Sequence, residues 1–144
     1  MSDTLIFEAL DLDDRQACLS IRLEVFCVEQ KVSIEIEFDG LDDECRHYLA
    51  TQNGRGVGTA RARMLNDTEI KLERIAVQKV HRKSGIGRLL VIRAISDAAQ
   101  KGYASAFLNS QVHACQFYAK LGFEADSDIF YEAGIPHRSM RRKL

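Results

Sequence analysis

The sequence has little of several features that define whole classes of protein. Among its 144 residues there is no uncharged apolar run of the roughly 18 residues that a membrane span needs. The opening decapeptide has neither the basic segment nor the long apolar run of a secretory signal. The formal net charge is -1, which gives no global attraction to a polyanion such as DNA. We therefore expect a cytoplasmic protein that binds neither nucleic acid nor membranes.

Cysteine is also sparse, and its spacing is uninformative. The four cysteines, Cys18, Cys27, Cys45 and Cys115, form no CxxC pair, which argues against a zinc ribbon and against a disulfide-stapled scaffold. No cluster of histidine, cysteine and aspartate has metal-ligand spacing, so no metal is expected. Free thiols in a reducing cell are the simplest interpretation. Cys27 as a nucleophile stays open, and it would need a histidine base such as His47.

With one proline and 46% hydrophobic residues, the chain is expected to fold as a single α/β (α+β) domain over residues 1–144. The hydrophobic periodicity predicts strands and helices along its whole length. Strands are predicted at residues 5–10, 46–51, 57–65, 70–77, 103–109, from 123 and at 137–142. Helices are predicted after the capping residues 11–14, at 86–99 and at 112–120. The acidic run at residues 35–44 is expected to be a solvated loop or, alternatively, a site for a cationic acceptor.

The most informative segment is a predicted strand followed by a glycine-containing turn and a helix. This arrangement gathers unpaired backbone N–H groups and the positive end of the helix dipole at one point, where a phosphate can bind. Gly85 and Gly87 allow a close approach of the ligand, and Arg82, Lys83 and Arg88 add positive charge. The spacing fits neither a Walker A loop nor a dinucleotide fingerprint.

Several motifs resemble the GNAT superfamily of N-acyltransferases. The sequence RxxGxG at residues 82–87, after LxxIAV at 72–77, resembles its acyl-CoA pyrophosphate loop, and QxxAxxFYxxLGF at 111–123 resembles its late helix and strand. The motifs RxxVFxxEQ at 22–30, DGxD at 39–42 and GIPHxxM at 134–140 resemble the bacterial ElaA-like branch. The resemblance implies a mixed, mostly antiparallel central sheet that is flanked by helices and splayed to bind acyl-CoA.

The resemblance also implies site residues. The implied cofactor-binding residues are Ile75, Ala76, Val77, Arg82, Lys83, Ser84, Gly85, Ile86, Gly87, Arg88 and Gln111. The residues implied to bind the acceptor substrate are Arg22, Glu29 and His137.

Two residues match positions of catalytic groups in that superfamily. Glu73 is the candidate general base, because a partly apolar cleft can raise the pKa of a carboxyl group. The alternative is a strand glutamate paired with Arg74 or Lys71. Tyr118 is the candidate acid for the departing thiolate, and the alternative is a core aromatic residue. Strand alternation is expected to place Glu73, Ile75 and Val77 on one face.

These expectations describe an N-acetyltransferase that uses acetyl-CoA. An amine of a small molecule or peptide would attack the thioester directly in a ternary complex. A CoA-binding sensor without catalytic activity is the competing hypothesis, and a thiol hydrolase that uses Cys27 is a third. The resemblance leaves a homodimer possible. The acceptor is expected to contact the variable residues 22–44 and 126–137.

Overall fold

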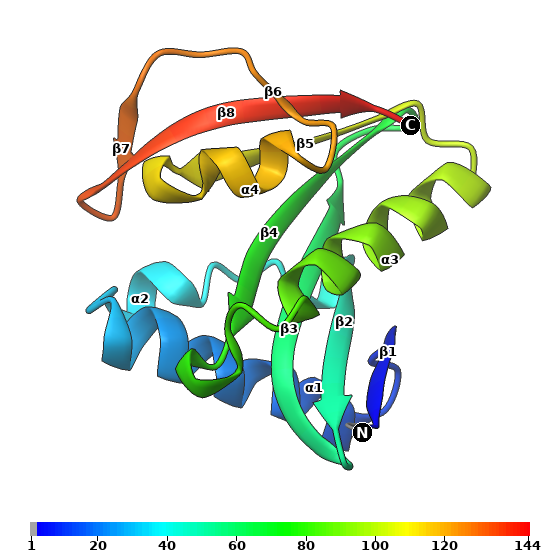
Figure 1. The fold of residues 1–144 in the computed structure, drawn as a ribbon, viewed down its shortest axis with the longest axis vertical. Coiled ribbons are helices and arrows are strands. Elements are labelled where there is room, and N and C mark those ends of the chain that lie inside the picture. The colour runs from blue at the N-terminus through cyan, green and yellow to red at the C-terminus, as the bar shows by residue number, and fades with distance from the viewer. Residues whose placement is uncertain (1–2) are drawn as a thin grey trace.

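The computed structural model describes residues 3–144 and contains an eight-stranded sheet in that part of the chain (Figure 1). The strand order is β1-β2-β3-β4-β5-β8-β6, and β7 pairs with β8. Of the pairs given for these strands, β4 with β5 is parallel and the rest are antiparallel, so the expected mostly antiparallel sheet is confirmed. The strands are β1 (Thr4–Glu8), β2 (Cys45–Gln52), β3 (Arg55–Met64), β4 (Glu69–Val77), β5 (Ser105–Gln111), β6 (Glu124–Ala125), β7 (Phe130–Glu132) and β8 (Ile135–Lys143).

Helices cover both faces of this sheet. They are α1 (Leu12–Arg22), which continues as a π-helix (Leu23–Glu29), α2 (Ile34–Glu37), α3 (Ile86–Gln100) and α4 (Cys115–Ala119). Short 3₁₀ turns occupy Asp42–Glu44, Lys79–His81 and Val112–Ala114. Figure 1 shows α3 on one side of β2, β3 and β4, with α1 and α2 on the other. None of the helices in residues 3–144 has the length and apolarity needed to cross a membrane.

Helix α1 forms where the capping residues and the apolar periodicity predict it. Its N-cap is Asp11, whose carboxylate accepts a 2.8 Å hydrogen bond from the backbone N–H of Asp14. Cys18 and Ile21, with Val25 on the π-helix, are buried in a small cluster against the sheet. The prediction of a helix over this segment is confirmed, and the π-helix extends it toward the open end of the sheet.

Helix α3 packs on the opposite face and supplies the larger hydrophobic core. Its residues Leu90, Val91 and Ala94 are almost fully buried against β2, β3 and β4. Burying the Leu90 and Val91 side chains contributes about 1.5–3 kcal/mol each. This packing fixes the N-terminus of α3 close to the C-terminal end of β4. The predicted strand–turn–helix unit is therefore confirmed.

The sheet opens between β4 and β5. The two strands pair in parallel from Glu69 with Ser105 to Leu72 with Leu108, and no paired residues follow. Beyond this point β4 runs on to Val77 with its β5-facing edge free of a strand partner. The expected splay of the sheet is therefore present at these positions, and Figure 1 shows the two strands diverging.

One sequence-based expectation about β4 is wrong. The register with β3 shifts after Arg61 pairs with Glu73, and Arg74 adopts a φ of 54°. This bulge inserts one extra residue and reverses the alternation of side chains. Ile75 and Val77 therefore pack against the α3 core, whereas Glu73 faces Arg61 on the side of α1. Glu73 does not share a face with Ile75 and Val77, because simple alternation fails across a bulge.

The last part of the chain differs in detail from the prediction. The turn at residues 132–136 is confirmed, but it joins β8 to a short strand, β7, that the sequence pattern did not reveal. The predicted helix at 112–120 begins as a 3₁₀ turn and ends at Ala119, and Gly122, which has a φ of 91°, follows it. The resulting β7–β8 hairpin stands beside the opening of the sheet.

Candidate functional site

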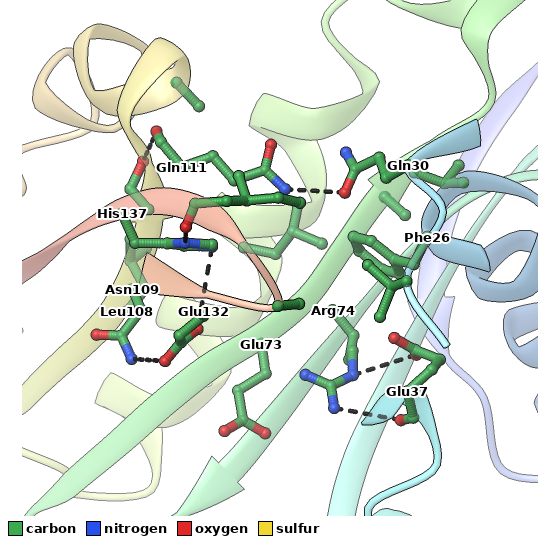
Figure 2. Close-up of a pocket in the computed structure, with 18 of the residues that line it drawn as sticks. Phe26, Gln30, Glu37, Glu73, Arg74, Leu108, Asn109, Gln111, Glu132 and His137 are labelled. Carbon is green, nitrogen blue, oxygen red and sulfur yellow. Dashed lines mark hydrogen bonds and ion pairs between the residues drawn. The ribbon is translucent and has the colours of Figure 1, made fainter. Parts of the chain in front are cut away.

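A cleft of about 600 Å³ occupies the opening between β4 and β5 (Figure 2). One wall is formed by the π-helix, α2 and β4, and the other by β5, α4 and the β7–β8 hairpin. Its size fits a small-molecule site. Lining residues from the first wall include Phe26, Gln30, Glu37, Glu73, Arg74, Ile75, Ala76, Val77 and Arg82. Those from the second wall include Asn109, Gln111, Tyr118, Glu132 and His137.

The glycine loop lies where β4 leads into α3. Gly85 caps the helix with a φ of 89°, and the backbone N–H of Leu89 is the first to bond back to it. The amides of Ile86, Gly87 and Arg88 therefore lack helical acceptors. A Cβ placed on Gly85 would meet no atom within 4 Å, so the outer face of the loop has room for a ligand. These amides, at the positive end of the 15-residue α3, fit a phosphate group.

Arg82 joins this loop to the cleft. Its guanidinium makes hydrogen bonds of 2.6 and 2.7 Å to the two carboxylate oxygens of Glu29 and donates from Nε to the carbonyl of Val77. The hydrogen bond from Arg82 lowers the pKa of the Glu29 carboxyl group. Of the implied loop residues, Arg82 lines the cleft, whereas Lys83, Ser84 and the residues up to Arg88 lie outside its lining. Glu29 positions Arg82 rather than lining the cleft itself.

Tyr118 lies on α4 with its ring buried between two other aromatic rings. The ring centroids of Phe117 and Phe123 lie 4.9 and 6.1 Å from it. No group in residues 3–144 forms a hydrogen bond with its hydroxyl, although the residue lines the cleft. Burial, and then the nearby Cys115, raise the pKa of Tyr118, so the hydroxyl stays protonated at neutral pH. This hydroxyl is a hydrogen-bond donor available to a ligand.

Glu73 is held by three cations. Arg61 and Arg63 both form ion pairs with its carboxylate, and Lys71 Nζ lies 3.3 Å from Oε1. Burial alone would raise the pKa of Glu73, but hydrogen bonds and charges from these partners outweigh it and lower that pKa. The rise that the sequence suggested is therefore not found, because the surroundings are cationic rather than apolar. A carboxylate stabilised in this way is a weak proton acceptor.

Three of the six carboxylates in the acidic run at residues 35–44 are bound by arginines, whereas Glu35, Asp43 and Glu44 are exposed as a solvated loop would have them. Arg22 donates to Glu37 at 2.7 Å and to Asp42 at 2.8 Å, and Arg61 shares Asp42 and also binds Asp39. The Arg22 side chain is 1% exposed, so it has no surface to offer a substrate. It supports the cleft indirectly by holding Glu37 in the wall. Buried arginines form ion pairs with Glu37, Asp39 and Asp42, and a count of charges along the sequence cannot reveal these pairs.

Arg74, at the bulge of β4, forms an ion pair and a hydrogen bond with Glu37 on α2. Its Nε lies 3.1 Å from a Glu37 carboxylate oxygen, and its terminal nitrogen donates to the Glu37 carbonyl at 3.2 Å (Figure 2). The left-handed backbone at Arg74 is strained for a residue other than glycine. These contacts hold the strained residue in place and fix the wall formed by α2.

A chain of polar side chains crosses the mouth of the cleft. The Gln111 Nε2 atom donates a 2.9 Å hydrogen bond to Gln30 Oε1, and Gln111 Oε1 lies 2.7 Å from His113 Nε2. Figure 2 shows the pair of glutamines extending toward each other from opposite walls. Gln111 was implied by the resemblance, whereas the role of Gln30 as its partner was not predicted.

The β7–β8 hairpin brings a histidine and a carboxylate to the second wall. His137 Nδ1 lies 2.7 Å from the carbonyl of Ile135, and its ring stacks on Phe130. Glu132 accepts a 2.9 Å hydrogen bond from Asn109, and its other oxygen lies 3.9 Å from His137 Nε2 (Figure 2). Glu132 and Asn109 were not singled out from the sequence, because the contact depends on the unpredicted strand β7.

The described residues contain no group of three histidine, cysteine, aspartate or glutamate side chains that could hold a metal ion. The described contacts of Cys27 include no histidine, and burial followed by the charge of Glu37 raises the pKa of its thiol. The His47 Nε2 atom lies 2.8 Å from the carbonyl of Asp42.

Comparison with known proteins gives the family to which this fold and open cleft belong. The profile of the Acetyltransferase (GNAT) domain matches residues 10–144. The chain belongs to this GNAT acetyltransferase family.

Individual relatives agree with this membership. The uncharacterized N-acetyltransferase YjcF of Bacillus subtilis is 43% identical over 124 residues, which cover 85% of this chain and 87% of YjcF. The crystal structure of a putative N-acetyltransferase from Lactobacillus plantarum has a TM-score of 0.91 at 26% identity and covers 98% of both chains. The crystal structure of Escherichia coli ElaA has a TM-score of 0.84 at 26% identity and covers 99% of both chains. The resemblance to the ElaA-like branch is thus confirmed.

Proposed function

We propose that this protein transfers an acetyl group from acetyl-CoA to a primary amine of a small molecule or peptide. The observation that carries the proposal is the coincidence of two features at the end of β4. The sheet opens after Leu72 into a cleft, and the free amides of the α3 N-terminus lie at the end of the same strand. An extended molecule with an anionic head and an apolar arm fits these features together.

In this proposal the pyrophosphate binds the amides around Gly85, assisted by Arg82, Lys83 and Arg88. The arm lies along the unpaired edge of β4, where the backbone of Ile75, Ala76 and Val77 offers hydrogen-bonding groups. Gln111 contacts the arm from β5. Binding both substrates in one cleft lets the amine attack the thioester directly and avoids a covalent enzyme intermediate.

Two steps need proton transfer. The departing thiolate needs a donor, and the Tyr118 hydroxyl is a protonated group in the cleft that has no hydrogen-bond partner in residues 3–144. The amine needs an acceptor, and Glu73 and His137 are the two candidates in the cleft lining. Glu73 also stabilises the wall through its ion pairs with Arg61 and Arg63.

Mass spectrometry of reactions with acetyl-CoA and a panel of primary amines tests this function. The expected result is an acetylated amine and free CoA, formed only in the presence of the protein. Calorimetry with CoA is the parallel measurement. Binding of CoA without product from any amine would favour the sensor hypothesis, and absence of both would contradict the assignment of the cleft.

A further inference from the structure

The β7–β8 hairpin brings His137 to the cleft, and the Nε2 atom of this residue has no hydrogen-bond partner among the described residues. A backbone carbonyl only accepts hydrogen bonds, so the 2.7 Å contact with Ile135 requires the proton of neutral His137 to lie on Nδ1. The lone pair is therefore on Nε2. The nearest ion-pair contact of Nε2 is the Glu132 oxygen at 3.9 Å, which is beyond hydrogen-bond distance. The neutral imidazole is thus fixed in one tautomer, and none of the described residues forms a hydrogen bond with its basic nitrogen.

The ring is also fixed in orientation. It stacks on Phe130 with centroids 6.1 Å apart and an interplanar angle of 21°, and the side chain is 10% exposed. Packing and the Nδ1 hydrogen bond leave it little freedom to rotate. A proton acceptor that is held in this way needs no rearrangement when the reacting group arrives.

Glu132 adds a negative charge beside this nitrogen. Its carboxylate is bound by the neutral amide of Asn109, whereas Glu37, Asp39 and Glu73 are each bound by arginines. Glu132 is also half exposed, so a ligand can reach it. Among the described carboxylates that line the cleft, it is the one without a lysine or arginine partner. Glu132 can therefore attract a cationic ligand, whereas the charges of the other carboxylates are already balanced by arginines.

We propose that Glu132 and His137 form the site for a primary alkylammonium acceptor, in which Glu132 binds the cation and His137 Nε2 removes its proton. This inference rests on the proposed acetyl transfer. It assigns the proton acceptor to His137 rather than to Glu73, whose carboxylate is occupied by three cations. A primary alkylammonium ion is the acceptor class that needs both groups.

The protons balance as follows. The ammonium group gives one proton to Nε2, and the neutral nitrogen attacks the thioester carbon, so that a C–N bond forms and the C–S bond breaks. Tyr118 gives its proton to the sulfur and regains one from the attacking nitrogen. His137 releases its proton to solvent. The products are the amide, free CoA and one proton.

The test compares amines that differ in protonation. The probes are ethylamine, 1,4-diaminobutane and the amide of Nα-acetyl-lysine, which are cationic at pH 7, and 2,2,2-trifluoroethylamine, which is largely neutral. The variant is His137→Asn, since an asparagine amide can still donate to the Ile135 carbonyl. We expect a fall of about 100-fold in kcat for the cationic probes and less than about 3-fold for the neutral one. Calorimetry should give an unchanged Kd for CoA.

Glu132→Gln keeps an acceptor for Asn109 and removes the charge. It should raise KM about 10-fold for the cationic probes, as expected for one lost charge-assisted contact, and leave KM for the neutral probe unchanged. Glu124→Gln, which removes an exposed carboxylate on β6, is the control and should change KM neither for the cationic probes nor for the neutral one.

Three results would overturn the inference. One is wild-type turnover of the neutral amine but of none of the cationic probes. Another is an equal loss for cationic and neutral amines in His137→Asn, which would indicate a structural role. The third is full activity in that variant. Failure of the wild-type protein to acetylate any amine would instead contradict the proposed function itself.

Discussion

The Gln111 side chain on β5 donates a 2.9 Å hydrogen bond to Gln30 at the end of the π-helix, across the opening between β4 and β5. These two residues are 81 positions apart in the sequence and belong to opposite walls of the cleft. His113 lies on the other side of the Gln111 amide. The position of the amide is therefore fixed from both ends before any ligand arrives.

Replacing Gln111 by alanine should weaken the binding of acetyl-CoA. The loss of one hydrogen bond to the arm corresponds to about 1 kcal/mol, or roughly a 5-fold increase in Kd. Isothermal titration calorimetry measures this change. Gln116→Ala on the exposed face of α4 is the matched control and should bind with the wild-type Kd. An unchanged Kd in both variants would show that the arm does not contact Gln111.

Gly85→Glu should abolish CoA binding. The new side chain would occupy the open outer face of the loop and place a negative charge where the phosphate is proposed to bind. Calorimetry measures the binding, and circular dichroism checks the fold. The expected result is a loss of affinity greater than 100-fold.

The substitution also strains the backbone, because Gly85 has a φ of 89°. Gly102→Glu at the other end of α3 is the matched control, since Gly102 has a φ of 92° and equally open surroundings. Both variants should lose about 1 kcal/mol of stability, and only Gly85→Glu should lose CoA binding. Equal binding by the two variants would place the phosphate elsewhere.

Tyr118→Phe should lower kcat about 100-fold and leave both stability and the Kd for CoA unchanged. The hydroxyl has no hydrogen-bond partner among the described residues, so its removal leaves no protein group unsatisfied. Steady-state kinetics with a saturating amine measures kcat. Tyr131→Phe removes a hydroxyl from an exposed residue of β7 and should leave kcat unchanged. Wild-type turnover in Tyr118→Phe would assign the tyrosine to packing alone.

Glu73→Gln should destabilise the protein at pH 7 by about 3 kcal/mol, because it removes the buried carboxylate that pairs with Arg63 and leaves Arg61 with only its partners Asp39 and Asp42. Urea denaturation measures the free energy of unfolding. Glu44→Gln, at an exposed position, should have little effect. A change of less than about 0.5 kcal/mol would mean that the ion pairs contribute nothing net.

The same carboxylate predicts a pH dependence. The pKa of Glu73 is lowered in the folded state, so the unfolded chain takes up its proton first as the pH falls. Its contribution is complete above about pH 4.3, the unfolded value, and is lost as the pH falls through the lower folded value. The difference in stability between wild type and Glu73→Gln should therefore shrink between pH 5 and pH 3. A constant difference would contradict the lowered pKa.

Local patterns in the sequence predicted most of the fold. Asp11 marks the start of α1, and Gly85 and Gly102 flank α3. The succession of short strands and turns predicted the antiparallel meander of β2, β3 and β4. Each of these signals involves neighbouring residues. The motifs at residues 72–77 and 82–87 also placed the cleft at the correct strand.

The parts that sequence reasoning missed depend on distant contacts. The bulge at Arg74 changes the face of every later residue in β4, and no local signal marks it, since arginine rarely has a positive φ. The partners of the acidic run come from α1, β3 and β4. Glu132 became visible as a site residue only when β7 paired with β8.

Cys27→Ser should retain wild-type activity, because the surroundings of Cys27 argue against the thiol-hydrolase hypothesis. A nucleophilic cysteine needs a lowered pKa and a base, whereas the pKa of Cys27 is raised and no histidine is among its described contacts. Incubation with acetyl-CoA, followed by intact-mass spectrometry, should show no acetyl adduct that Cys27→Ser removes. Cys115→Ser controls for the loss of a thiol near Tyr118. A stable adduct at Cys27, together with loss of turnover in Cys27→Ser, would replace direct attack by the amine with a covalent mechanism.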